Sequence, residues 1–194
     1  MAVNARIDLI LLRKITNYYD EIRFIHLITK KFKRSSIGWY YRKLVYSLLL
    51  NERINSFNAV LALNRNDIKK RDKSEYESLF KGLSSLWKQE DSDLLDIANR
   101  FSRSYYLWSY IHFVYEKSFM RVRKVIDGLN ELDKSSIEIF FIEQVFEAFE
   151  TWKSWSQKNI YNGSGLDFLY KLIELITQLG VEKFMGDFQF NSSF

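Results

Sequence analysis

The 194-residue sequence contains no cysteine and no proline. Without cysteine the chain forms no disulfide bond, no thiolate zinc site and no cysteine nucleophile, although this absence leaves the redox compartment open. An average usage of about 5% would give roughly ten prolines, and only seven glycines are present. Because sheet-rich folds need many turns, the scarcity of turn residues predicts an all-α chain of long helices with no sheet.

The N-terminal sequence MAVNARIDLILLRK mixes acidic and basic residues and lacks the basic, apolar and small-residue regions of a signal peptide. The longest strongly apolar uncharged run, residues 104–115, is shorter than the ~20 residues that a membrane-spanning helix needs. We therefore expect a mature intracellular N-terminus, a cytoplasmic location and no transmembrane segment.

Histidine, a frequent general base, occurs only twice, at His26 and His112. Each lies in an apolar helical pattern without a local partner, which favours a structural or surface role over catalysis. The motifs G-x-x-x-x-G-K, G-x-G-x-x-G and G-x-S-x-G are absent. The sequence predicts no catalytic residue and no cofactor, and we expect a protein that is not an enzyme.

Acidic residues cluster in two places. The first cluster consists of Glu90, Asp91, Asp93 and Asp96, and the second of Glu143, Glu147 and Glu150. Such clusters can bind Mg²⁺, but acids at a helix N-terminus favour the helix dipole, which is our interpretation of the first cluster. The second shares one helical face opposite an apolar stripe, as a solvated surface does. The E-x-x-H elements of di-iron bundles are absent, and no metal site is predicted.

Apolar residues at three- and four-residue steps divide the chain into about six helices, and two S-x-x-E capping boxes, Ser74 with Glu77 and Ser135 with Glu138, mark helix starts. The expected helices cover about 4–32, 36–63, 74–88, 92–129 with a break near Lys117, a segment opened by Ser135, and 166–179.

We expect a single helical domain over residues 1–194. The alternative is a division into a basic helical hairpin, 1–63, and a helical bundle, 74–180. The two would be joined by residues 64–73, which are polar and lack apolar periodicity.

The net charge of +5 is distributed unevenly along the chain. Residues 1–50 hold ten Lys and Arg against three Asp and Glu, whereas residues 51–194 hold nineteen against twenty-one. Residues 22–51 contain seven basic residues and no acidic one. Such a concentration creates a positive potential that can recruit polyanions.

The densest part of this region, residues 30–43 (KKFKRSSIGWYYRK), places six basic and four aromatic residues in fourteen positions. A structural interpretation explains part of it, because cations at the end of one helix complement its dipole and Ser35 or Ser36 can cap the next helix. That interpretation leaves Arg42, Lys43 and Trp39 unexplained.

Two interpretations remain open: a plain solvated junction between helices, or a binding surface on which cations neutralise phosphates and Trp39, Tyr40 or Tyr41 stack on unpaired bases. The predicted nucleic-acid-binding residues are Lys30, Lys31, Lys33, Arg34, Trp39, Tyr41, Arg42 and Lys43.

Two smaller basic groups are secondary candidates for the same surface. They contain Lys69, Lys70 and Arg71, and Arg121, Arg123 and Lys124. The sequence leaves open whether they share a face with residues 30–43. No base-reading motif is present, so contact with the RNA or DNA backbone would be independent of base sequence.

The favoured hypothesis is a non-catalytic helical binding or assembly subunit that contacts nucleic-acid backbone, within a larger nucleoprotein complex. Small basic all-helical subunits, such as the small subunits of CRISPR effectors, are analogous in general type, without a shared motif. The main alternative is a helical protein-protein adaptor or regulator that binds no nucleic acid, with protein partners or a homo-oligomer. A membrane-surface role for the basic helix comes third.

Overall fold

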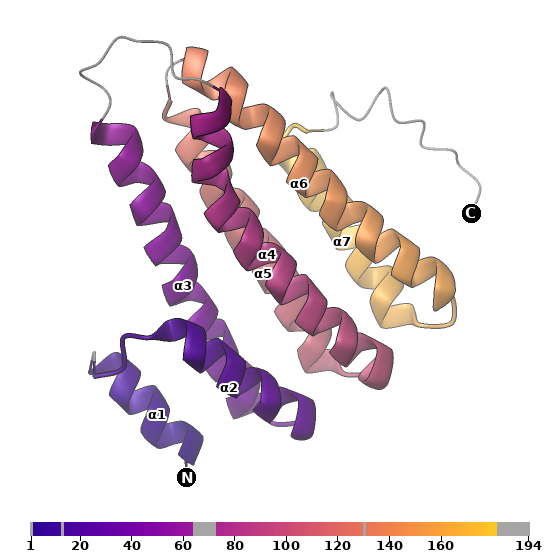
Figure 1. The fold of residues 1–194 in the computed structure, drawn as a ribbon. Coiled ribbons are helices and arrows are strands. Elements are labelled where there is room, and N and C mark those ends of the chain that lie inside the picture. The colour runs from indigo at the N-terminus through magenta and orange to yellow at the C-terminus, as the bar shows by residue number, and fades with distance from the viewer. Residues whose placement is uncertain (1, 13, 64–72, 130, 182–194) are drawn as a thin grey trace. The chain divides into compact units, whose positions relative to one another are not determined.

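The computed structural model describes all residues except 1, 13, 64–72, 130 and 182–194 (Figure 1). The described part is all-helical, which confirms the predicted fold class, and contains seven helices and no strand. They are α1 (Ala2–Leu11), α2 (Tyr18–Lys31), α3 (Ser36–Leu63), α4 (Lys73–Phe101), α5 (Tyr105–Asp127), α6 (Glu131–Lys158) and α7 (Gly163–Gln178). Among them, none combines the length and apolar character that a membrane crossing requires.

The segment expected as one helix over 4–32 is two helices, α1 and α2. Asn17 caps α2, and its side-chain oxygen accepts a hydrogen bond from the Asp20 amide at 3.3 Å. Asp20 and Glu21 then place acidic side chains in the first turn, where they favour the helix dipole. A local start signal therefore prevails over an apolar periodicity that continues through it.

The expected boundary near residues 88–92 was also wrong, because α4 runs without a break to Phe101. The chain turns at 102–104 instead of near Lys117. Ser104 opens α5, with its Oγ 3.4 Å from the Leu107 amide that donates to it. The first acidic cluster thus lies inside α4. Ser135 lies inside α6 and does not open it.

The described chain forms two compact units, Met1–Lys117 and Ser118–Phe194, with the boundary inside α5. In the first unit α3 packs against α1, α2 and α4. Of the predicted connection at 64–73, residues 64–72 lie outside the described residues. In the second unit α6 and α7 lie side by side (Figure 1), and the rings of Trp152 and Phe168 meet with centroids 5.5 Å apart.

A buried ion pair joins the helices of the first unit. Arg42 on α3 and Glu90 on α4 are both buried, and the Arg42 Nε donates to the Glu90 Oε1 at 2.8 Å. The Tyr110 hydroxyl on α5 donates to the same oxygen at 2.6 Å, and Arg42 Nη1 donates to the Thr29 Oγ1 on α2 at 3.0 Å. Arg42 Nη2 lies 3.5 Å from the Asp93 Oδ2. This Arg42–Glu90 network therefore connects α2, α3, α4 and α5.

The charge on Arg42 is retained inside the unit. Burial by itself would lower the pKa of Arg42, but the nearby Glu90 and Tyr110 oxygens raise it above its usual value. Burial, followed by the Glu90 carboxylate, also raises the pKa of Tyr110 and keeps its hydroxyl protonated as a donor. The network is thus a charged pair with fixed hydrogen bonds.

A second buried carboxylate, Glu21 on α2, accepts hydrogen bonds from Arg6 on α1 and from the Tyr41 hydroxyl on α3. Burial by itself would raise the pKa of Glu21, but the hydrogen bonds from Arg6 and Tyr41 lower it below its ordinary value. This carboxylate fixes α1 and α2 against the start of α3.

Removing one partner of the buried pair should destabilise the first unit strongly. Arg42→Met leaves the Glu90 carboxylate buried without its cation, and we expect a loss of about 3 to 5 kcal/mol in the free energy of unfolding, measured by urea denaturation. The double variant Arg42→Met/Glu90→Leu should recover part of that loss, because no uncompensated charge remains. Lys171→Met, which removes an exposed ion pair with Asp167, should cost less than about 1 kcal/mol. Strictly additive single and double losses would contradict this account.

We expect His26 to make the stability depend on pH. Its Nδ1 lies 3.4 Å from the Asp93 Oδ2. Burial lowers the pKa of His26, Asp93 opposes that shift, and the cations Arg42 and Lys30 reinforce it, so that the pKa is below its ordinary value of 6.5. The folded chain then binds this proton more weakly than the unfolded chain, and stability present above pH 6.5 is lost as the pH falls. Urea titrations between about pH 7 and about pH 5.5 should show this loss, and His26→Gln should reduce it. Equal pH slopes for the two proteins would contradict the assignment.

Candidate functional site

Two helix connections meet in the first unit. The connection from α2 to α3 comprises residues 32–35, and the connection from α4 to α5 comprises residues 102–104. The Lys33 carbonyl accepts hydrogen bonds from the Trp39 Nε1 at 2.9 Å and the Ser104 Oγ at 3.4 Å. The Lys33 Nζ lies 3.9 Å from the centroid of the Phe101 ring, a cation–π contact. Contacts of both the backbone and the side chain of Lys33 thus hold the two connections together.

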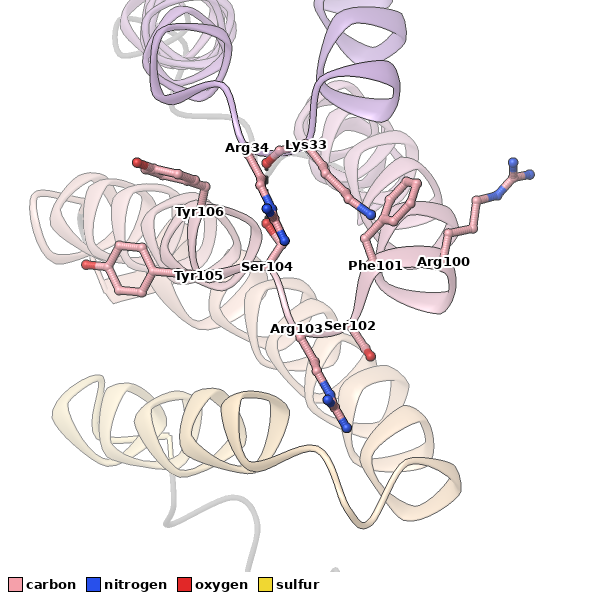
Figure 2. Close-up of a pocket in the computed structure, with 9 residues that line it drawn as sticks. All are labelled: Lys33, Arg34, Arg100, Phe101, Ser102, Arg103, Ser104, Tyr105 and Tyr106. Carbon is pink, nitrogen blue, oxygen red and sulfur yellow. Dashed lines mark hydrogen bonds between the residues drawn. The ribbon is translucent and has the colours of Figure 1, made fainter.

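A pocket of about 450 Å³ opens where these connections meet. Four of its nine lining residues are cationic, two are tyrosines and none is acidic. The lining consists of Lys33, Arg34, Arg100, Phe101, Ser102, Arg103, Ser104, Tyr105 and Tyr106 (Figure 2). We call this the basic pocket.

The four cations of the basic pocket differ in their partners. Arg100 forms an ion pair with Asp96 at 2.9 Å, and Lys33 makes a cation–π contact with the Phe101 ring. Arg34 and Arg103 are exposed, and neither has a carboxylate within 4.0 Å among the residues that the structure describes. Both lie beyond the last turn of the preceding helix, α2 or α4, where the effect of the helix dipole has fallen off. Arg34 and Arg103 are therefore the cations of the pocket that remain available to an anion.

Aromatic rings lie beside these cations. Tyr105 is 77% exposed and Tyr106 is 36% exposed, with ring centroids 5.8 Å apart and planes at 71°. In the view of Figure 2, Arg34 lies between the two tyrosines and Phe101, and Arg100 points away from the tyrosines. The pocket thus combines unpaired guanidinium groups with open aromatic faces.

Three of the residues predicted to bind nucleic acid are in the core. Trp39, Tyr41 and Arg42 are buried, and each has an internal hydrogen-bond partner: the Lys33 carbonyl, Glu21 and Glu90 respectively. A buried indole cannot stack on a base, and a buried guanidinium cannot reach a phosphate. Their assignment to a binding surface was therefore wrong. Tyr40 is the exposed aromatic of the Trp39–Tyr41 run.

The remaining residues of the stretch 30–43 have different environments. Lys43 is half-buried, its Nζ donates to the Ser109 Oγ at 3.3 Å, and burial lowers its pKa. Lys30 lies 2.5 Å from the Asp96 carboxylate, and this hydrogen bond lowers the pKa of Asp96. Lys31 is exposed in the last turn of α2, with its Nζ 5.5 Å from the Phe32 ring centroid. Of the eight predicted residues, the structure places Lys33 and Arg34 in the pocket.

Of the two secondary basic groups, one falls within the described residues and does not line the pocket. Lys69, Lys70 and Arg71 lie outside the described residues. Arg121, Arg123 and Lys124 are on α5 in the second unit. Arg123 pairs there with Asp127 at 3.1 Å and with Glu138 at 2.5 Å.

Sequence reasoning missed Arg100, Arg103, Tyr105 and Tyr106 as members of the site. A signal for them exists, because residues 97–115 contain no acidic residue. The structure brings part of this acid-free run against part of the other one, residues 22–51. Comparing acid-free runs along the whole chain would have pointed to both connections.

The other histidine and the second acidic cluster of the sequence do not line the pocket. His112 on α5 lies 3.6 Å from Glu116 one turn away, and Glu143 and Glu147 are exposed on α6. Within the described ranges, no group of three or more histidines and carboxylates is arranged to hold a metal ion.

No protein-family model, curated protein or solved structure matches the chain. Any functional assignment therefore depends on the structure itself, and the basic pocket is its most distinctive surface feature.

The burial of Trp39 gives a testable consequence for stability. Trp39→Phe removes the hydrogen bond to the Lys33 carbonyl while keeping an aromatic ring in the core. We expect a loss of about 0.5 to 1.5 kcal/mol in the free energy of unfolding for the bond, with a further cost for the smaller ring. Chemical denaturation followed by circular dichroism measures it. An unchanged midpoint would show that the Trp39 bond contributes nothing to holding the connection.

Proposed function

We propose that this chain is a non-catalytic binding subunit whose basic pocket contacts the phosphate backbone of nucleic acid. The observation that carries the proposal is that Arg34 and Arg103, from two different connections, both line one pocket without an acidic residue. Intramolecular contacts, either a salt bridge or a cation–π contact, account for Lys30, Lys33 and Arg100, which line the pocket or lie near it.

Phosphate is the anion that this chemistry suits. Arginine presents a planar group with several donors that matches a phosphate in two-point contacts. Each phosphate neutralised also releases condensed counterions, which adds a salt-dependent contribution to the affinity. Two exposed arginines in a pocket also lined by Lys33 and Arg100 supply this interaction at a fixed place on the surface.

The contact would be independent of base sequence. The two cations lie in short connections, whereas direct readout of a duplex requires a helix or strand ribbon seated in the major groove. Backbone contacts position a nucleic acid without specifying its sequence. This suits a subunit that lines nucleic acid within a larger assembly.

The double variant Arg34→Gln/Arg103→Gln tests the proposal. Charge-assisted bonds contribute about 1.5 to 3 kcal/mol each, so the affinity for labelled duplex and single-stranded oligonucleotides should fall about tenfold or more per arginine at low salt. On duplex, the slope of log affinity against log salt should become shallower by about 0.9 per lost contact. Fluorescence anisotropy across a salt series measures both.

A matched control separates the pocket from net charge. Arg23→Gln/Lys81→Gln removes the same charge from exposed positions of the first unit that do not line the pocket. It should lower the affinity less than the pocket variant. Equal losses for the two variants, or no salt-sensitive binding by the wild-type protein at low ionic strength, would contradict the proposal.

A protein adaptor is the second candidate, favoured by a different surface. Around the connection from α6 to α7, Ile160, Tyr161 and Tyr170 are exposed, with Tyr161 97% exposed. Exposed aromatic and aliphatic side chains of this kind are typical anchors for protein partners. If the wild-type protein bound no nucleic acid, the adaptor hypothesis would replace nucleic-acid binding as the favoured function.

A further inference from the structure

We propose that the basic pocket holds an unpaired nucleotide, with its base against Tyr105, and that the protein therefore prefers single strands to duplexes. This inference rests on the proposed function and deepens it, because it names the form of nucleic acid that the same site selects. It depends on the tyrosines, whereas the proposed function depends on the arginines.

The exposure of Tyr105 has no explanation in the packing of α5. Four other apolar or aromatic residues early in this helix are buried: Leu107, Trp108, Tyr110 and Ile111. Tyr105 is the first residue of α5 and stays 77% exposed at the edge of the basic pocket. A large aromatic ring left open beside unpaired cations is suited to a ligand that carries both a flat apolar surface and a negative charge.

The neighbouring ring helps to hold Tyr105 in place. Tyr106 is less exposed, and the two rings meet edge to face at 71° with centroids 5.8 Å apart. Such arrangements are among the favoured geometries of aromatic pairs. Tyr105 therefore starts from a restrained orientation, which reduces the entropy lost when a base stacks on it.

The pocket has room for more than a phosphate group. Its volume of about 450 Å³ is within the roughly 300 to 1,000 Å³ of pockets that enclose small organic ligands. In the proposed arrangement Arg34 and Arg103 contact phosphates of a strand whose unpaired base lies against Tyr105. In this arrangement one unpaired nucleotide meets a cation and an aromatic ring at the same time.

A duplex cannot make the same contact. Its bases are stacked on each other, and its phosphates alone are free to reach the arginines. An unpaired base has an open face, and stacking on an aromatic side chain is tolerant of base identity. Charge therefore attracts both forms of nucleic acid, and Tyr105 distinguishes between them.

Substitution of Tyr105 tests this selectivity. The probes are labelled oligothymidylate, labelled oligouridylate, a strand of equal length made of abasic sites, and a duplex of equal length. Tyr105→Ala should weaken oligothymidylate binding by about 5- to 140-fold, the range that corresponds to one stacked base. Binding of the duplex and the abasic strand should stay within about twofold. Tyr105→Phe should retain the wild-type affinities, because a phenyl ring also stacks.

An exposed tyrosine elsewhere provides the control. Tyr161→Ala removes a 97% exposed ring from the second unit and should change the affinity for no probe. Because Tyr105 and Tyr161 are exposed, both variants should keep the wild-type circular dichroism spectrum. The two single-stranded probes cover both a DNA and an RNA strand, and a Tyr105 effect on either supports the inference.

The outcomes distinguish this inference from the proposed function. If Arg34→Gln/Arg103→Gln weakens every probe while Tyr105→Ala weakens none, the backbone contact stands and the selectivity is wrong. An equal effect of Tyr105→Ala on single strands, duplex and abasic strand would also overturn the selectivity. If the wild-type protein binds none of the probes, both proposals are wrong.

Discussion

The buried ion pair between Arg42 and Glu90 is the constraint on which the first unit depends. A guanidinium group inside a helical core needs compensation for its charge, and in this core Glu90 and Thr29 accept its hydrogen bonds while the Asp93 carboxylate lies 3.5 Å from Nη2. These partners and Tyr110 come from three other helices. The pair therefore fixes how α3 lies against α2, α4 and α5.

This constraint also positions the basic pocket. Thr29, Arg42 and Tyr110 lie within about two turns of the ends of α2, α3 and α5 that flank the two connections. With these helix ends held together, the Lys33 carbonyl meets both Trp39 and Ser104. The backbone that carries Arg34 and Arg103 is therefore held in place, so that mainly their side chains must be ordered when an anion binds.

The structure divides the basic residues of the first unit by role. Arg42 serves the core, Lys30 and Arg100 share the Asp96 carboxylate, and Lys43 is half-buried. Arg34 and Arg103 have no such role. We infer that a cation of this unit contributes to binding only where the fold has not already supplied its partner. A dense run of lysines and arginines does not by itself define a surface.

Much of the fold follows from the sequence, because the absence of proline and the apolar spacing act locally. The all-helical class and most helices are accessible in this way. The break before Tyr105 was missed because the apolar pattern runs through it and Ser104 is a weak local signal.

The burial of Arg42 could not be predicted, because its partner Glu90 is 48 residues away in the sequence. No residue close to Arg42 in the sequence indicates that it is buried. The same limit applies to the pocket. Arg34 was predicted from its local cluster, but Arg103 gains its significance only when the fold brings residues 102–104 against residues 32–35.

Photochemical crosslinking tests the central claim, that nucleic acid lies in the basic pocket, most directly. A single strand carrying photoactivatable thymidines would be irradiated with the whole chain, and the linked peptides identified by mass spectrometry. We expect crosslinks at Tyr105 and Tyr106 that are lost when Arg34 and Arg103 are both replaced by glutamine. Crosslinks confined to the second unit, or unchanged in that variant, would contradict the claim.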